Sequence, residues 1–102
     1  MKIKRIKKLK VLSFSFDIKW DKSNDGGMFD YNDRIISIGV NSNDDSEALM
    51  ILIHELTEIC AIEMGVRFRR PDVNDDYMFV YDHRQHGTMT TMLASLLEQF
   101  IV

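Results

Sequence analysis

The sequence predicts one α+β domain, in which a small antiparallel, hairpin-rich sheet packs against two helices. Hydrophobic and polar residues alternate from Val11 to Trp20, and two further apolar runs flank a turn at Asn32-Asp33, as in a hairpin. Two longer segments, 44–64 and 83–101, have helical patterns. A chain of 102 residues, 45% of them hydrophobic, can bury one core but not two, so residues 1–102 form a single domain.

Residues 1–10 form a basic segment with six lysine or arginine residues and no acid. One interpretation is a nucleic-acid-binding arm. The other is a solvated edge strand or helix that docks through Ile3, Ile6 and Leu9, while its lysines discourage aggregation. Residues 11–102 hold 7 basic and 16 acidic residues, and the basic segment contains no aromatic residue. We therefore favour docking and do not expect a nucleic-acid partner.

The strand that follows places five hydrophobic residues on one face: Leu12, Phe14, Phe16, Ile18 and Trp20. Residues 21–27 are rich in turn-forming residues and predict a loop. Residues 28–31 and 34–40 then predict the two strands of the hairpin.

The long helix is the most apolar part of the chain. Residues 48–64 contain no glycine or proline and are hydrophobic almost all round, which predicts a buried helix. Asp44 followed by Glu47 marks its start, and Gly65 is placed to end it. Cys60, the only cysteine, cannot form an internal disulfide and is expected to pack as a small hydrophobic residue.

The second helix follows a charged connection, residues 67–76, for which we expect a solvated loop, and a short apolar run, residues 77–81, for which we expect a strand or an extended segment. Asp82 is placed to cap the helix. Hydrophobic residues at helical spacing then predict a core-facing stripe of Met89, Leu93, Leu96, Leu97 and Phe100.

Three titratable residues lie in the middle of the long helix. His54 and Glu58 are four residues apart and share one helix face, so both side chains can reach one cation. This is the spacing of the zinc-binding His-Glu-x-x-His motif, with glutamate as the second ligand and Glu55 as the proton acceptor. The alternative is structural: His54 and Glu58 form an i,i+4 hydrogen-bonded pair.

A metal site needs a third ligand, and the second helix carries two candidates. His86 points with the hydrophobic stripe towards the long helix, whereas His83 is rotated towards the edge. His54, Glu58 and His86 would form a two-histidine, one-glutamate set with an open position for water. His83 is an alternative ligand, a hydrogen-bond partner of a ligand, or an exposed residue. Zinc is the expected metal, although these residue types also bind manganese or nickel.

These residues resemble a family of small phage and prophage proteins of zincin-like, metallopeptidase type. The resemblance rests on His54-Glu55-Leu56 with Glu58, and on Gln85-His86 in the later helix. Residues 26–31, leading into 35–38, also resemble the hairpin that precedes the active-site helix of minimal metallopeptidases. The resemblance implies a minimal zincin-like fold and phage or prophage origin, with His54, Glu58 and His86 on the metal and Glu55 as general base.

The expected activity is hydrolysis of a peptide or amide bond in a peptide or protein substrate. The metal would activate water, Glu55 would accept its proton, and Tyr77 or Tyr81 could donate to the oxyanion. The alternative is a non-enzymatic phage accessory protein that binds a protein or nucleic-acid partner, with a structural metal or none. Without an apolar membrane-spanning stretch or a signal-peptide pattern, the chain is expected to be cytoplasmic, with no membrane partner. The sequence predicts no oligomeric state.

Overall fold

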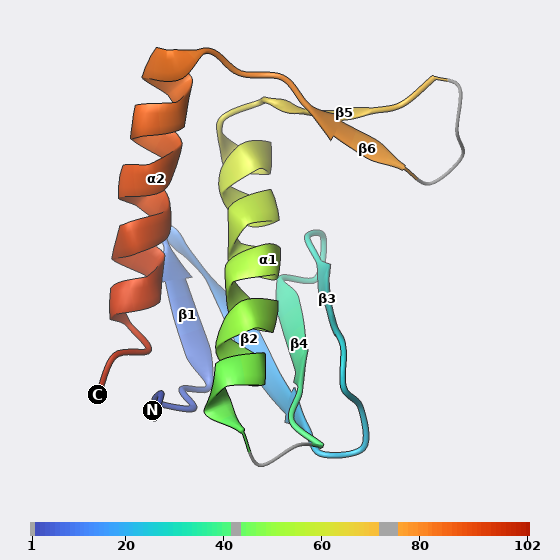
Figure 1. Ribbon diagram of the computed structural model, residues 1–102, viewed down its shortest axis with the longest axis vertical. Helices are drawn as coiled ribbons and strands as arrows, with labels where there is room; N and C mark the ends of the chain where they lie inside the picture. Colours follow the sequence, from blue (N-terminus) through green and yellow to red (C-terminus); the bar gives the residue numbers. More distant parts are fainter. Residues whose placement is uncertain (1, 42–43, 72–75) are drawn as a thin grey trace.

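Four strands form a twisted sheet, and two helices lie side by side on one of its faces (Figure 1). The structure, a computed structural model, describes residues 2–41, 44–71 and 76–102. The sheet has the order β1-β2-β4-β3, and β5 and β6 form a separate two-stranded sheet beyond the end of α1 (Figure 1). The elements are β1 (Lys8–Val11), β2 (Phe14–Asp21), β3 (Gly27–Asp30), β4 (Ile35–Gly39), α1 (Asp45–Glu63), β5 (Arg67–Arg69), β6 (Tyr77–Phe79) and α2 (His83–Glu98).

The sheet is mixed, so the expectation of a purely antiparallel sheet was wrong. The hairpins β1–β2 and β3–β4 are antiparallel, but β2 and β4 pair in parallel from Asp17 opposite Ile35 to Asp21 opposite Gly39. The chain leaves β2, forms β3 at the outer edge, and returns as β4 between the two. Alternation of hydrophobic residues specifies which face of a strand is buried, but it does not specify the neighbouring strand.

The basic segment docks onto the body and contributes an edge strand, as the favoured interpretation predicted. Ile3 and Leu9 are buried and Ile6 is partly buried. The Gln99 side chain hydrogen-bonds both the N–H and the C=O of Lys10, each at 2.8 Å, and so satisfies part of the free edge of β1. Leu12 does not join the buried face: it lies in the β1–β2 turn with φ +54° and is 61% exposed.

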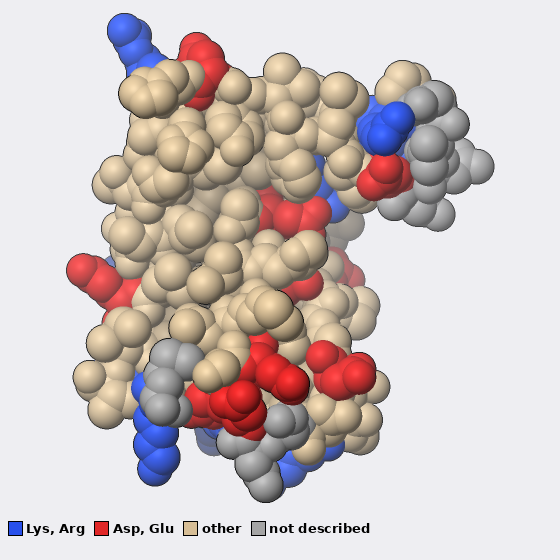
Figure 2. Space-filling view, viewed as in Figure 1, with Lys and Arg blue, Asp and Glu red and all other residues tan. Residues whose placement is uncertain are grey.

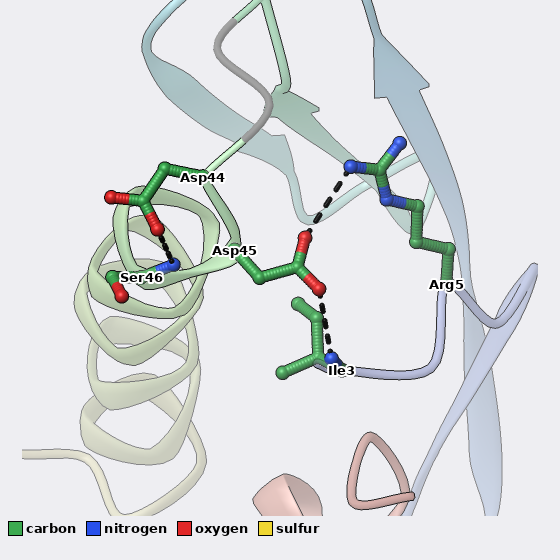
Figure 3. Close-up of polar contacts among 5 residues, drawn as sticks. All are labelled: Ile3, Arg5, Asp44, Asp45 and Ser46. Carbon is green, nitrogen blue, oxygen red and sulfur yellow. Dashed lines mark hydrogen bonds and ion pairs between the residues drawn. The ribbon is translucent and has the colours of Figure 1, made fainter. Parts of the chain in front are cut away.

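A second contact ties the N-terminal segment to the start of α1 (Figure 3). The backbone N–H of Ile3 donates to Asp45 Oδ2 at 3.0 Å, and Arg5 Nη2 lies 3.4 Å from Asp45 Oδ1. The Ile3 N–H, with a smaller effect from Arg5, holds the pKa of Asp45 below its usual value. Residues 2–10 are therefore an integral part of the fold.

Both helices begin and end close to the predicted positions. Asp44 caps α1 by accepting from the Ser46 N–H, and Gly65, with φ +70°, follows its C-terminal end. Asp82 caps α2 in a reciprocal capping box with Gln85. In the predicted stripe Met89, Leu96 and Phe100 are buried, and Leu93 and Leu97 pack against the core.

Of the two remaining predictions, the one for Cys60 is confirmed and the one for residues 67–69 is wrong. Cys60 is buried in the core, and burial raises the pKa of its thiol to about 11. Residues 67–69 are strand β5, paired with β6, so the expectation of a loop there was wrong; residues 72–75 of that connection lie outside the described residues. Within the part that is described, no helix is long and apolar enough to cross a membrane.

Candidate functional site

A groove of about 540 Å³ runs between α1 and the edge strand β3, and it is bounded at one end by the β5–β6 hairpin. His54, Glu55 and Glu58 of α1 line it, together with Arg67 and Tyr77 of the hairpin. A smaller pocket of about 310 Å³ adjoins it at His54 and Glu55 and is otherwise lined by Gly27, Met50 and Ile51. The predicted titratable residues of α1 therefore face a cavity.

Gly27 opens this cavity. It lies in β3 against α1, where an added Cβ would be 2.4 Å from Ile51 Cγ2 and 3.3 Å from Glu55 Oε1. A larger residue there would press on the helix and cover the Glu55 carboxylate. Sequence reasoning missed this role, although a glycine inside a strand often marks a close approach.

His54 and Glu58 lie together on the groove side of α1. His54 Nε2 is 3.8 Å from Glu58 Oε2, and the two side chains are 72% and 21% exposed. The predicted proximity is confirmed, but the distance is too long for the hydrogen bond of the structural alternative. An imidazole nitrogen and a carboxylate oxygen at this separation form half of a ligand set suited to zinc.

Glu55 is the only charged residue, of those described, that is buried, with 5% exposure. Burial raises the pKa of its carboxyl; Glu58 adds to this, whereas His54 and Arg67 oppose it. A carboxylate at the wall of a cavity with a raised pKa is a stronger base than an exposed glutamate, as a general base needs to be.

Arg67 connects the hairpin to the site. Its Nε lies 3.5 Å from Glu58 Oε1, and its guanidinium stacks 3.6 Å from the ring centre of Tyr77 and 5.5 Å from that of Phe29. The side chain is only 18% exposed, and its Nε is buried without a hydrogen-bond acceptor. Sequence reasoning assigned Arg67 to a solvated loop. The signal for a short hairpin was the alternation of Arg67-Phe68-Arg69 together with the apolar run at residues 77–79.

His83 and His86 lie in the first turn of α2, and both are exposed. The His86 ring stacks between Tyr81, at 6.0 Å, and His83, at 6.5 Å. Across residues 2–41, 44–71 and 76–102, no three His, Cys, Asp or Glu side chains gather in a group that could hold a metal ion. The structure brings His54, Glu55 and Glu58 together and does not add either histidine of α2, so the third ligand stays a prediction.

The donors present fit a divalent metal in part. His54 and the Oε2 atom of Glu58 could provide two ligands, while Arg67 lies beside Oε1 and balances the carboxylate charge. Comparison with family models, with curated proteins and with solved structures found no match.

Proposed function

We propose that the protein is a metal-dependent hydrolase of peptide or amide bonds, with the α1–β3 groove as its active site. The observation that carries this proposal is the buried carboxylate of Glu55, which lines the groove together with His54 and Glu58. Burying a carboxylate destabilises a fold unless the group is compensated. A helix packed on a sheet has no structural need for one at this position, whereas hydrolysis needs a base there.

The position of β3 favours an extended peptide as substrate. Among the described strands β3 pairs with β4 alone and lies at the edge of the sheet, so a peptide can add to its outer side through main-chain hydrogen bonds. Such a peptide would pass along the groove, with its carbonyl groups near His54 and Glu55. The adjoining apolar pocket could accept one of its side chains.

Each residue then has a defined role. His54 and Glu58 hold the metal ion, for which zinc is the first candidate, and Glu55 takes a proton from the attacking water and delivers it to the leaving amine. When bound, the metal would polarise the scissile carbonyl and make water more acidic. Tyr77 lines the groove and is the better oxyanion donor of the two tyrosines considered, because Tyr81 stacks on His86 instead.

His86 is proposed as the third protein ligand and His83 as its alternative. Both lie in the first turn of α2 and are exposed, outside the hydrophobic core. Direct measurement of metal content separates the two. We expect His86→Ala to lower zinc content and His83→Ala, its neighbour in the same turn, to leave it unchanged.

The experiment that tests the function combines metal content with hydrolysis. Protein purified without a histidine tag should bind zinc, as measured by mass spectrometry, and should cleave members of an unstructured peptide library. His54→Ala and Glu58→Gln should lose both properties. Zinc-supplemented wild-type protein that neither retains metal nor cleaves any peptide would overturn the proposal.

A second function class is favoured by the exposed apolar residues around β6. Six residues, each between 40% and 54% exposed, gather there: Phe68, Tyr77, Met78, Phe79, Val80 and Tyr81. Such a cluster suits a non-enzymatic accessory protein, of phage origin if the resemblance holds, that binds a protein partner in the cytoplasm. In that case Phe79→Ser should abolish partner binding, and Glu55→Gln should have no effect on it.

A further inference from the structure

A second hollow lies away from the α1–β3 groove. It is an open groove of about 900 Å³ between α2 and the β1–β2 turn, and it shares no lining residue with the candidate active site. Gly87, Thr91 and Ser95 of α2 form one wall, and Leu12 lies on the other side. Leu12 is 61% exposed and has a left-handed backbone, an unfavourable combination for a leucine.

The outward face of α2 carries no charge over most of its length. Residues 85–97 contain no Asp, Glu, Lys or Arg, although 28% of the chain is charged. Thr88, Thr91, Ala94 and Ser95 are nevertheless exposed. The molecular surface over α2 is accordingly almost free of acidic and basic side chains (Figure 2). The face of a helix that meets only water normally carries charged residues, so this face has the composition of a contact surface.

The exposed residues form a straight stripe that is bounded by opposite charges. Arg84, Gly87, Thr91, Ser95 and Glu98 follow at steps of three or four residues and therefore lie along one side of the helix, over about 21 Å. The side chains between the two ends are small and uncharged, so a second helix can approach closely. Arg84, the positive end, lies seven residues before Thr91, and Glu98, the negative end, lies seven residues after it.

This pattern is complementary to itself in one orientation only. If two copies of α2 pack antiparallel about Thr91, Arg84 lies beside Glu98 of the partner subunit, and Gly87 lies beside Ser95 of the partner subunit. Both pairs occur twice, as a twofold-symmetric contact requires. Parallel packing would instead bring arginine to arginine and glutamate to glutamate, which is repulsive.

From this charge complementarity we infer that the groove is a homodimer interface, in which each α2 packs antiparallel against α2 of a second copy. The dimer covers the exposed stripe from Arg84 to Glu98 together with the adjoining wall of the groove, and Leu12 lies at the rim of the contact. Neither α1 nor β3 takes part in the contact, so the α1–β3 groove of each subunit stays open. The inference is independent of the proposed hydrolase function.

Sedimentation equilibrium over a concentration series tests the dimer through charge reversal. The wild-type protein should be dimeric, and Arg84→Glu and Glu98→Arg should each be monomeric, because each leaves two repulsive pairs. The double variant should dimerise again, and an equimolar mixture of the two single variants should form a heterodimer. Circular dichroism should show the same helix content in all variants.

Neighbouring threonines provide a matched control. Thr90 and Thr91 are both exposed, and each hydroxyl donates to Gly87 O at 3.0 Å, but only Thr91 lies on the stripe. Thr91→Lys should give a monomer, whereas Thr90→Lys should remain a dimer. A monomeric wild-type protein at every concentration would overturn the inference. So would charge-reversal variants that dimerise like the wild type.

Discussion

At the scale of single residues, the ionisation of Glu55 links the proposed chemistry to stability. Burial raises the pKa of Glu55 in the folded protein above its ordinary value of 4.5, so the folded state favours the protonated form. The stabilising contribution of that form is complete below pH 4.5 and is lost as pH rises through the folded-state pKa. An ionised Glu55 at neutral pH is therefore a cost to the fold, of the kind that function commonly imposes.

Glu55→Gln is accordingly expected to increase the free energy of unfolding at pH 7 and to have little effect at pH 4. Urea denaturation at the two pH values measures this difference. Glu47→Gln is the control, because Glu47 is an exposed residue of the same helix and should give no gain. A Glu55→Gln protein that is less stable than the wild type at pH 7 would mean that the carboxylate is compensated within the fold.

Gly27 tests the shape of the cavity. In Gly27→Ala the new Cβ would overlap Ile51 Cγ2, so we expect a loss of about 1–3 kcal/mol in the free energy of unfolding from overpacking. Hydrolysis should also fall, because the methyl group lies over the Glu55 carboxylate. Gly26→Ala is the control, since no atom of the described residues lies within 4 Å of the Cβ position at Gly26. Equal effects of the two substitutions would show that the close approach at Gly27 has no role.

At the scale of helices and strands, the ends of the two helices could be predicted, because they depend on interactions between residues close together in the sequence. The ends of α1 and α2 follow from Asp44, Gly65 and Asp82, whose capping interactions involve residues only two to four positions away. The order of the sheet could not be predicted in this way. The parallel pairing of β2 with β4 depends on packing between segments more than fifteen residues apart.

The cap of α2 gives a prediction for a whole element. Asp82→Ala removes the acceptor of the Gln85 N–H but keeps the reciprocal bond, in which the backbone N–H of residue 82 donates to Gln85 Oε1. We therefore expect a loss of about 0.5–2 kcal/mol in the free energy of unfolding. Asp82→Asn keeps an acceptor and should recover most of the loss. Thermal denaturation followed by circular dichroism measures both variants, and an alanine variant as stable as the wild type would contradict the role of the cap.

The β5–β6 hairpin depends on Arg67 for its attachment to the body. Arg67→Met removes the ion pair with Glu58 and the cation–π contacts with Tyr77 and Phe29. We expect faster amide hydrogen exchange throughout residues 67–69 and 77–79, with α1 and the four-stranded sheet unchanged. Arg34→Met, which removes a cation–π contact with Phe14 away from the hairpin, is the comparison. Slow exchange in the Arg67→Met hairpin would show that another contact attaches it.

At the scale of the whole molecule, only the part of the candidate site that lies on α1 could be predicted from the sequence. His54, Glu55 and Glu58 follow from helical spacing, and the structure places all three at one groove. Arg67 and Gly27 come from other elements and enter the groove through tertiary packing, so no spacing in the sequence indicates them. For the same reason His86 could be placed on a helix face but not at a distance from His54.

The docked N-terminal segment changes how a nucleic-acid role would be tested. Deletion of residues 1–10 would remove most of β1 and the contact of Ile3 with Asp45, and would therefore damage the fold. Replacing the exposed Lys2 and Lys4 by glutamine keeps the docked residues and removes charge. The docked interpretation predicts unchanged stability and no salt-dependent nucleic-acid binding in either protein, as measured by fluorescence anisotropy.

The most direct test of the hydrolytic groove compares the wild type and Glu55→Gln, each loaded with the same measured amount of zinc, on one peptide that the wild type cleaves. Because Glu55 acts as base and His54 and Glu58 hold the metal, Glu55→Gln should keep its zinc and its fold while its rate falls by about 100-fold or more. Equal rates for the two proteins, or no cleavage of any peptide by the zinc-loaded wild type, would contradict the assignment of this groove as a hydrolytic site.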